Sequence, residues 1–204
     1  MNVHLYITMA RHKTIPDEAV LDTILDTLRA AGPAGLTFAR AAKACGLSPA
    51  TLVQRYGDRE SLLEAALLRA WDRLDEETEA ADREAAPTPA GAVAFLMRLM
   101  PAASAEEAAT DGLLLLREDI RNPVLRRRGA AWGHRIADAL GRRLSADAEE
   151  GKRLGWQMAS VWQGAHTWWA FTRERPAEEA IRGALEAWIE RALGDGGDGF
   201  LTAG

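Results

Sequence analysis

The stretch of sequence that decides the fold is LTFARAAKACGLSPATLVQRYGDRESLL, residues 36–63. Thr37 and the Ser48-Pro49 pair are typical of helix starts, because a hydroxyl accepts a backbone N–H and proline fits the first helical position. Gly46 suits a turn that needs a positive φ angle. We therefore expect a short helix, a turn, a second short helix, and then a longer helix capped by Asp58.

This order of elements is that of a helix-turn-helix, whose second helix lies in the major groove of DNA. Leu52 and Tyr56 are expected to bury the back of that helix. The side chains left outward are Pro49, Ala50, Thr51, Val53, Gln54 and Arg55. Glutamine and arginine can form paired hydrogen bonds to base edges, and a threonine hydroxyl suits phosphate. The spacing also fits an ordinary turn between two helices, so spacing alone leaves both interpretations open.

The charge is distributed unevenly along the 204 residues, whose net charge is −5. Residues 1–60 hold seven Lys or Arg and six Asp or Glu, whereas residues 61–204 hold eighteen and twenty-four. DNA responds to the charge of the contacting face, because attraction acts over roughly a Debye length of about 10 Å. A basic N-terminal patch on an acidic body is therefore compatible with a DNA partner.

The overall composition is that of a globular protein, with 48% hydrophobic and 27% charged residues. A single cysteine excludes a disulfide framework and any multi-cysteine metal cluster. No run approaches 18 apolar residues, so we expect no membrane partner. The first eleven residues lack the layout of a signal peptide, and we expect a cytoplasmic location.

Helical periodicity continues outside the opening stretch, and we expect an all-α protein of about nine helices. Apolar residues recur every three or four positions between Pro16 and Gly32. The apolar stripe of residues 62–74 predicts one helix that continues to about Glu84 and is roughly 40 Å long at 1.5 Å per residue. A helix of that length can join two domains.

Further helix starts are predicted beyond this linker. They combine a capping side chain or a proline with the following apolar pattern, and they are Thr88-Pro89, Ser104 with Glu107, Asn122-Pro123, Ser145 and Pro176. The last helix is expected to end at Gly194. Arg126-Arg127-Arg128 is expected to be an exposed helix start rather than a second nucleic-acid site.

A set of positions between residues 20 and 63 carries a more specific pattern. It comprises Val20-Leu21-Asp22, Gly32, Thr37, Ala42-Lys43-Ala44, Gly46-Leu47-Ser48, Thr51-Leu52, Tyr56, Arg59-Glu60 and Leu62-Leu63. These positions resemble the TetR (tetracycline-repressor) family of bacterial transcriptional regulators, with Arg59 where the family usually has lysine. The resemblance implies a repressor that binds a palindromic operator as a dimer and is released by a small apolar effector.

The resemblance also implies a domain organisation. We expect an N-terminal arm at residues 1–15, a helix-turn-helix DNA-binding domain at 16–60, a helical effector-binding and dimerisation domain at 61–194, and a flexible tail at 195–204. The last two helices are expected to form the dimer interface. Tryptophans are concentrated there, and tryptophan is enriched at interfaces because it combines a large apolar area with one N–H donor.

The residues expected to contact DNA are Thr37, Ser48, Pro49, Ala50, Thr51, Gln54, Arg55, Tyr56 and Arg59. Base reading is assigned to Gln54 and Arg55, and phosphate contact mainly to Thr37, Thr51, Tyr56 and Arg59. Two positions depart from the family pattern. Val53 stands where a tyrosine commonly touches the phosphate backbone, and Ala39 where many members carry a polar or basic residue. We therefore expect Gln54, Arg55 and the arm Arg11–Lys13 to read the operator.

The C-terminal half is expected to bind an apolar, planar effector. The expected wall residues are Met97, Leu114, Trp132, Trp162, His166 and Trp169. For each tryptophan, packing in the core or at the dimer interface is the alternative, and the same holds for His166. Asp111, Glu118 and Asp119 flank an apolar run and either complement a cationic effector or are simply solvated.

No enzymatic function or cofactor is expected. The four histidines are far apart without metal-ligand spacing, and the chain has neither a glycine-rich phosphate loop nor a nucleophile elbow. Cys45 occupies an inward helix position, where a thiol is normally inert. The alternative to a DNA-binding regulator is a helical interaction or scaffold protein whose helix-turn-helix no longer binds DNA, and Val53 and Ala39 are the residues that favour it.

Overall fold

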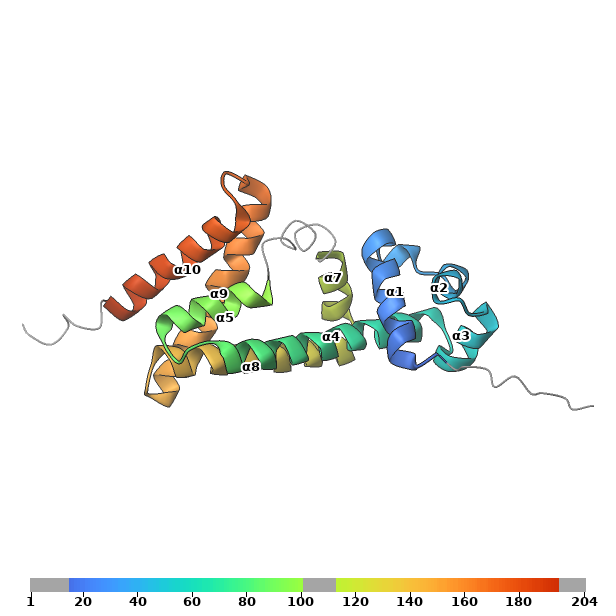
Figure 1. The fold of residues 1–204 in the computed structure, drawn as a ribbon, viewed down its shortest axis with the longest axis horizontal. Helices are drawn as coiled ribbons and strands as arrows, with labels where there is room; N and C mark the ends of the chain where they lie inside the picture. The colour runs from blue at the N-terminus through green and yellow to red at the C-terminus, as the bar shows by residue number, and fades with distance from the viewer. Residues whose placement is uncertain (1–14, 101–112, 195–204) are drawn as a thin grey trace, which may run out of the picture.

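The computed structural model describes residues 15–100 and 113–194, and every regular element in these ranges is a helix. The expected all-α fold is confirmed. Three short helices gather at one end of an elongated molecule, and the C-terminal helices gather at the other (Figure 1). The elements of the first half are α1 (Asp17–Ala31), the 3-10 turn η1 (Pro33–Gly35), α2 (Phe38–Cys45), α3 (Pro49–Tyr56) and α4 (Arg59–Glu84).

The helix starts predicted for residues 36–63 are confirmed by their hydrogen bonds. The backbone N–H of Arg40 donates to Thr37 Oγ1 (3.1 Å), that of Thr51 to Ser48 Oγ (3.0 Å), and that of Ser61 to Asp58 Oδ1 (2.8 Å). Gly46 ends α2 in the left-handed region with φ 65°. A side chain at that position would be strained, which explains why the turn uses glycine.

The N-terminal core joins the three short helices to the first turns of α4. Leu25 and Leu28 of α1 and Leu52 of α3 are buried in this core together with Leu62 of α4. Leu125, from much later in the chain, belongs to the same core. The boundary expected at residue 60 therefore falls inside one continuous apolar cluster, and α4 is shared between the two ends of the molecule.

The second half contains α5 (Pro89–Leu99), α7 (Leu113–Arg121), α8 (Pro123–Leu144), α9 (Ala148–Thr172) and α10 (Ala177–Gly194). The expected starts at Thr88 and Asn122 are confirmed, since both side chains cap their helices. The start expected at Ser145 is wrong. Asp147 caps α9 instead, accepting from the N–H of Glu150 at 2.8 Å. The capping box at residues 104–107, residues 1–14 of the arm and the tail lie outside the described residues.

Glycines allow α8 and α9 to touch backbone to backbone. A Cβ added to Gly155 would lie 2.0 Å from the carbonyl oxygen of Ala137, and one added to Gly141 would lie 2.6 Å from that of Gly151. No rotamer change can relieve such contacts, because the obstructing atoms belong to the backbone. This crossing fixes how α9 lies against α8.

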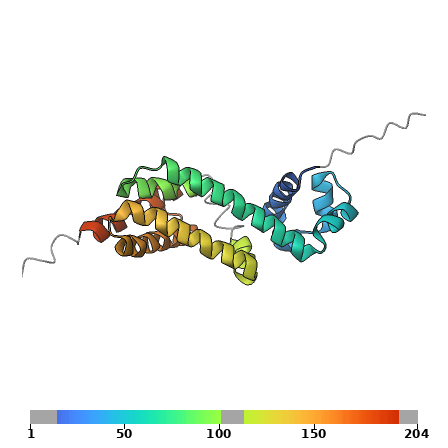
Figure 2. The ribbon, with the colours of Figure 1, turned by 90° about the horizontal axis from the view of Figure 1, so that it is seen from below.

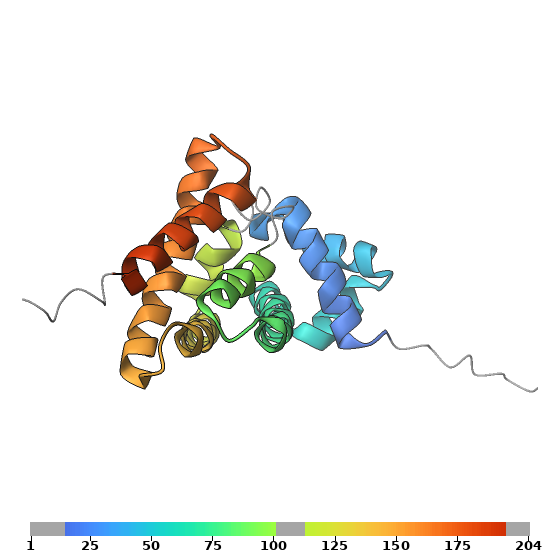
Figure 3. The same cartoon turned by 60° about the vertical axis from the view of Figure 1, so that its left-hand side comes forward.

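Helices α4 and α8 run side by side in the same direction (Figures 2 and 3). Acidic residues of α4 face arginines of α8: Arg128 pairs with Asp72 (2.5 Å) and Asp75, Arg135 with Asp75 (3.1 Å) and Glu79 (3.4 Å), and Arg142 with Asp82 (2.7 Å). The expectation that Arg128 is exposed is therefore wrong, because its guanidinium lies between two carboxylates of α4.

The end of α4 is bound to α8 by the buried Arg143, which is only 8% exposed. Its guanidinium donates to Asp82 Oδ1 (2.6 Å) and to the carbonyl oxygens of Asp82 (2.7 Å), Ala85 (3.0 Å) and Ala86 (3.1 Å). The last carbonyls of a helix have no partners within it, so Arg143 supplies donors that the helix lacks. Within residues 15–100 and 113–194, no helix is long and apolar enough to cross a membrane.

Candidate functional site

The helix-turn-helix lies at the end of the molecule opposite α10, and α3 is on its periphery (Figure 1). Leu52 is fully buried, as expected for the back of α3. Pro49, Ala50 and Gln54 are exposed, and Val53 is 47% exposed. The outer face of α3 therefore presents small and apolar side chains around one amide, a surface that fits direct contact with base edges.

The expectation that the Arg55 side chain points outward is wrong. Its side chain is only 19% exposed, and its Nη1 donates to the carbonyl oxygen of Ile15 (3.0 Å) and to Asp17 Oδ1 (3.1 Å). Tyr56 donates its hydroxyl proton to the same carboxylate oxygen at 3.2 Å. Burial and the Asp17 carboxylate raise the pKa of Tyr56 to about 12. Both side chains thus bind α3 to the start of α1 rather than pointing outward.

Arg59 is also used internally rather than presented to phosphate. Its Nε donates to the carbonyl oxygen of Leu36 (2.9 Å), and its Nη2 donates to that of Pro33 (2.5 Å). These carbonyls belong to the connection between α1 and α2. Arg59 Nη1 donates to Glu60 Oε1 at 3.3 Å, so the guanidinium bonds to three oxygen atoms of the protein in this structure.

The hydroxyl groups expected at phosphate lie at helix starts. Thr37 and Ser48 are exposed, and the hydroxyl oxygen of each accepts a backbone N–H. Thr51 is half-buried, and its Oγ1 lies 2.8 Å from Ser48 Oγ. The arm Arg11–Lys13 lies outside the described residues.

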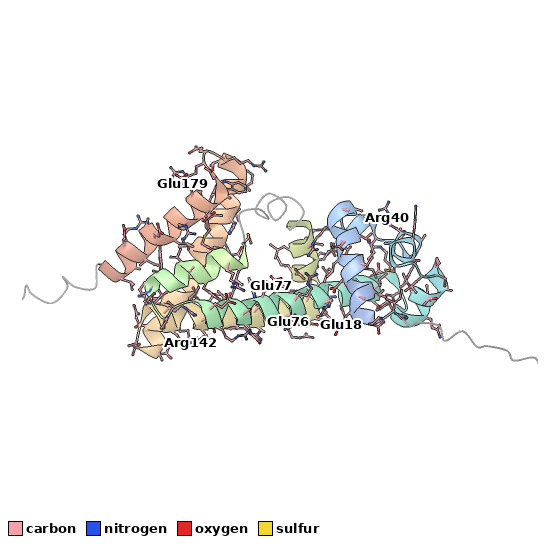
Figure 4. The ribbon with its side chains drawn as sticks, in the orientation of Figure 1. Glu18, Arg40, Glu76, Glu77, Arg142 and Glu179 are labelled. Atoms are coloured by element: carbon pink, nitrogen blue, oxygen red, sulfur yellow. The ribbon has the colours of Figure 1, made fainter. Side chains whose placement is uncertain are left out.

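Two exposed cations on α2 were not among the predicted contacts. Arg40 and Lys43 lie on the surface of α2, and the labelled Arg40 is at the same end of the molecule as α3 (Figure 4). Arg40 Nη1 also donates to the carbonyl oxygen of Gly35 at 2.7 Å. Both residues lie in the helix before the predicted turn, and this position could have indicated them as candidate phosphate contacts. With Arg55 and Arg59 engaged, they are the exposed cations of the helix-turn-helix among the described residues.

The second candidate site is a cavity of about 620 Å³ between α7, α8 and α9, closed on one side by α4. Its volume lies in the range of small-molecule sites, which is about 300–1,000 Å³. Four indoles line it, and they belong to Trp71, Trp132, Trp156 and Trp162. Trp132 and Trp162 were expected there, whereas Trp71 was missed because α4 lies far away in the sequence.

Met97, His166 and Trp169, which were also expected, do not line this cavity. Met97 and Trp169 pack against the C-terminal core, and the indole N–H of Trp169 donates to the carbonyl oxygen of Arg175 at 3.0 Å. His166 is half-buried with its ring 5.4 Å from that of Trp162, and burial lowers its pKa to about 4. Packing against the core is what the structure shows for Trp169, whereas His166 Nε2 is buried without a hydrogen-bond partner among the described residues. The side chain of Leu114 is not among those described.

The cavity contains one carboxylate in an aromatic setting. Trp71 Nε1 donates to Asp119 Oδ1 at 3.0 Å, which joins α4 to α7. The Trp71 and Trp132 rings meet edge to face with centroids 5.8 Å apart, and Trp132 lies 6.4 Å from Trp162. Burial raises the pKa of Asp119, although the hydrogen bond from Trp71 acts to lower it. The sequence indicates Asp119 as a carboxylate beside an apolar run, but not its contact with Trp71 of α4.

The fold is that of solved transcriptional regulators. A protein assigned as a transcriptional regulator in Pseudomonas aeruginosa PAO1 superposes with a TM-score of 0.70 and 16% identity, over 91% of this chain and 96% of that chain. The TetR-family regulator PfmR from Thermus thermophilus has a TM-score of 0.57 and 21% identity, over 85% and 98%. AibR, solved in complex with isovaleryl coenzyme A and operator DNA, has a TM-score of 0.57 and 16% identity, over 85% and 95%.

These structures define the class of fold. The chain has the fold of TetR-family transcriptional regulators, and the resemblance seen in residues 20–63 is confirmed at that level. The sequence itself matches no family model and no curated protein. The fold extends the likeness to the C-terminal half, where the sequence carries no motif.

Proposed function

We propose that this protein is a DNA-binding transcriptional regulator that binds a palindromic operator and responds to a small molecule. The observation that carries the proposal is the peripheral α3 in a helix-turn-helix, with its outer face exposed and Leu52 at its back buried in the N-terminal core. The fold shared with solved regulators supports the same function. An enzymatic role has no comparable support.

Base reading falls to Gln54 and Val53 in this proposal. An amide can pair with adenine N6 and N7, and an apolar side chain can contact the methyl group of thymine. Arg55 does not contribute a base contact while its guanidinium is bound to Asp17. We therefore expect half-sites in which A·T pairs face the middle of α3, with Arg40, Lys43 and the N-terminal arm near the phosphates.

The proposed operator geometry requires a dimer with two-fold symmetry. Among the described residues, the two most exposed large apolar side chains are Phe171 (77%) and Trp168 (70%), with ring centroids 6.1 Å apart on α9. Exposed aromatic rings of this size are typical of interfaces. We propose that α9 and α10 form the dimer interface, and that the two α3 helices then reach half-sites about 34–36 Å apart or a multiple of that distance.

The cavity is the proposed effector site. AibR was solved with both isovaleryl coenzyme A and operator DNA, so its fold accommodates a small molecule and DNA in one complex. Here Trp71 places a residue of α4 in the cavity wall, while the first turns of α4 pack under α3. A ligand that changes the position of Trp71 would therefore act on the helix-turn-helix through a single helix.

Selection of bound fragments from a random DNA library tests the proposal. We expect a palindromic site, and Gln54→Ala should lose discrimination at one base pair per half-site, worth about 1–3 kcal/mol. Gln157→Ala is the matched control, because this exposed amide lies on α9 at the other end of the molecule. Failure to enrich any sequence would favour the alternative function, a helical interaction protein.

A further inference from the structure

The carboxylate of Asp119 lies in an apolar cavity without a counter-charge. Its Oδ1 accepts from Trp71 Nε1, and no lysine, arginine or histidine of the described residues forms an ion pair with it. Its neighbour Glu118 differs, because Glu118 pairs with Arg117 at 3.3 Å. A half-buried carboxylate that gives up water without gaining a cation is costly, so the site favours a ligand that supplies the missing charge.

The walls of the cavity add to that preference. The faces of indole rings are electron-rich and attract organic cations, and four tryptophans line this cavity. The remaining polar side chains of the wall are Ser160, Gln163 and Arg126. Arg126 is exposed, and its Nη1 donates to the carbonyl oxygen of Ile120 at 3.1 Å. The interior is therefore acidic and aromatic, and its one cationic wall residue lies at the solvent side.

We propose that the cavity binds a lipophilic organic cation, with a planar apolar body among the tryptophans and an ammonium group at Asp119. Binding of such a compound is a property of the cavity alone, whereas its role as an effector rests on the proposed function. Two glycines of α8 place the tryptophan rings in the wall. A Cβ added to Gly129 would lie 3.3 Å from the Trp71 ring and one added to Gly133 would lie 2.9 Å from the Trp156 ring, so both indoles pack directly on the backbone of α8.

Calorimetric titration of the DNA-free protein with three isosteric probes tests the proposal. The probes are 2-naphthylmethylamine, 2-naphthalenemethanol and 2-naphthoate, which are cationic, neutral and anionic at pH 7.5. We expect the cation to bind at least tenfold more tightly than the alcohol, and the carboxylate to bind most weakly. Asp119→Asn should reduce that preference to within about twofold while leaving alcohol binding unchanged, because an amide oxygen still accepts from Trp71.

Glu118→Gln is the matched control, since it removes the same charge one residue away and outside the cavity wall. It should preserve the tenfold preference. Equal affinities for the three probes, a preference for the carboxylate, binding of none of them, or an unchanged preference in Asp119→Asn would overturn the proposal. Operator binding by the ligand-free protein is measured separately, so a protein that binds the cation but no DNA would contradict only the regulatory function.

Discussion

Arginines have different hydrogen-bond partners in the helix-turn-helix and along the contact between α4 and α8. In the helix-turn-helix, Arg55 donates to the carbonyl oxygen of Ile15 as well as to Asp17, and Arg59 donates to the carbonyl oxygens of Leu36 and Pro33. Along the α4–α8 contact, Arg128, Arg135 and Arg142 pair with carboxylates. The arginine bonds of the helix-turn-helix order a small domain that has few helices to pack. The arginine bonds between α4 and α8 align two long helices. A positive charge near the predicted recognition helix is therefore weak evidence for contact with DNA.

The largest expected effect concerns Arg143, which combines both arrangements. Arg143→Met would leave the Asp82 carboxylate and three carbonyl oxygens at the end of α4 without these donors. Removing one partner of a buried ion pair costs about 3–5 kcal/mol. Urea denaturation should show this loss, and a variant as stable as the wild type would mean that α4 ends without help from α8.

The next prediction distinguishes an arginine that stabilises the fold, Arg59, from a lysine proposed to lie near phosphate, Lys43. Arg59→Ala should lower the free energy of unfolding by about 2 kcal/mol, because charged donors to two carbonyls are lost. The slope of log operator affinity against log salt should not change. Lys43→Ala should do the opposite, leaving stability unchanged and flattening that slope by about one unit. A flatter slope for Arg59→Ala would show that Arg59 contacts phosphate, as the sequence predicts.

The third prediction concerns the pH dependence of stability that the buried ring of His166 causes. Burial lowers the pKa of His166 to about 4 from its ordinary value of 6.5, so the unfolded chain takes up the proton first. The stability contributed by the neutral ring is present above pH 6.5 and is lost as the pH falls towards 4. Between pH 7 and pH 5 this loss should be about 2 kcal/mol. In His166→Gln the part of the pH dependence due to this ring should disappear, and an unchanged profile would contradict its burial.

The smallest effect belongs to Arg142, the sequence neighbour of Arg143. It also pairs with Asp82, at 2.7 Å, but its side chain is 61% exposed. Exposed ion pairs contribute about 0.2–1 kcal/mol. Arg142→Met should therefore cost less than about 1 kcal/mol, which makes it the control for Arg143→Met. Similar losses in the two variants would show that burial is not what distinguishes them.

The helix starts could be predicted because their causes are local. The side chains of Thr37, Ser48 and Asp58 each accept the backbone N–H of the residue three positions later. Gly46 adopts a positive φ angle, which glycine tolerates without strain. Ser145 failed for an equally local reason, since Asp147 is a competing cap two residues later. Predictions of this kind depend on few residues and no distant contacts.

The side-chain assignments depended on contacts that the sequence does not display. Arg55 was expected to point outward, but its partner Asp17 lies 38 residues earlier. Trp71 and Asp119 are 48 residues apart and come together because α4 and α7 both pack against α8. Residue type and helical spacing limit which faces are exposed, but they do not identify the partner across a helix contact.

The parallel register of α4 and α8 restricts how the helix-turn-helix end can move. The pairing arginines of α8 recur every seven residues, at 128, 135 and 142, and their carboxylates follow in the same order along α4, at 72, 75, 79 and 82. An axial shift of α4 by half a helical turn, about 2.7 Å, would therefore lengthen these ion pairs together. Arg143 adds four hydrogen bonds to oxygen atoms at the end of α4. The contact between α4 and α8 thus opposes axial sliding of the helix that carries the helix-turn-helix.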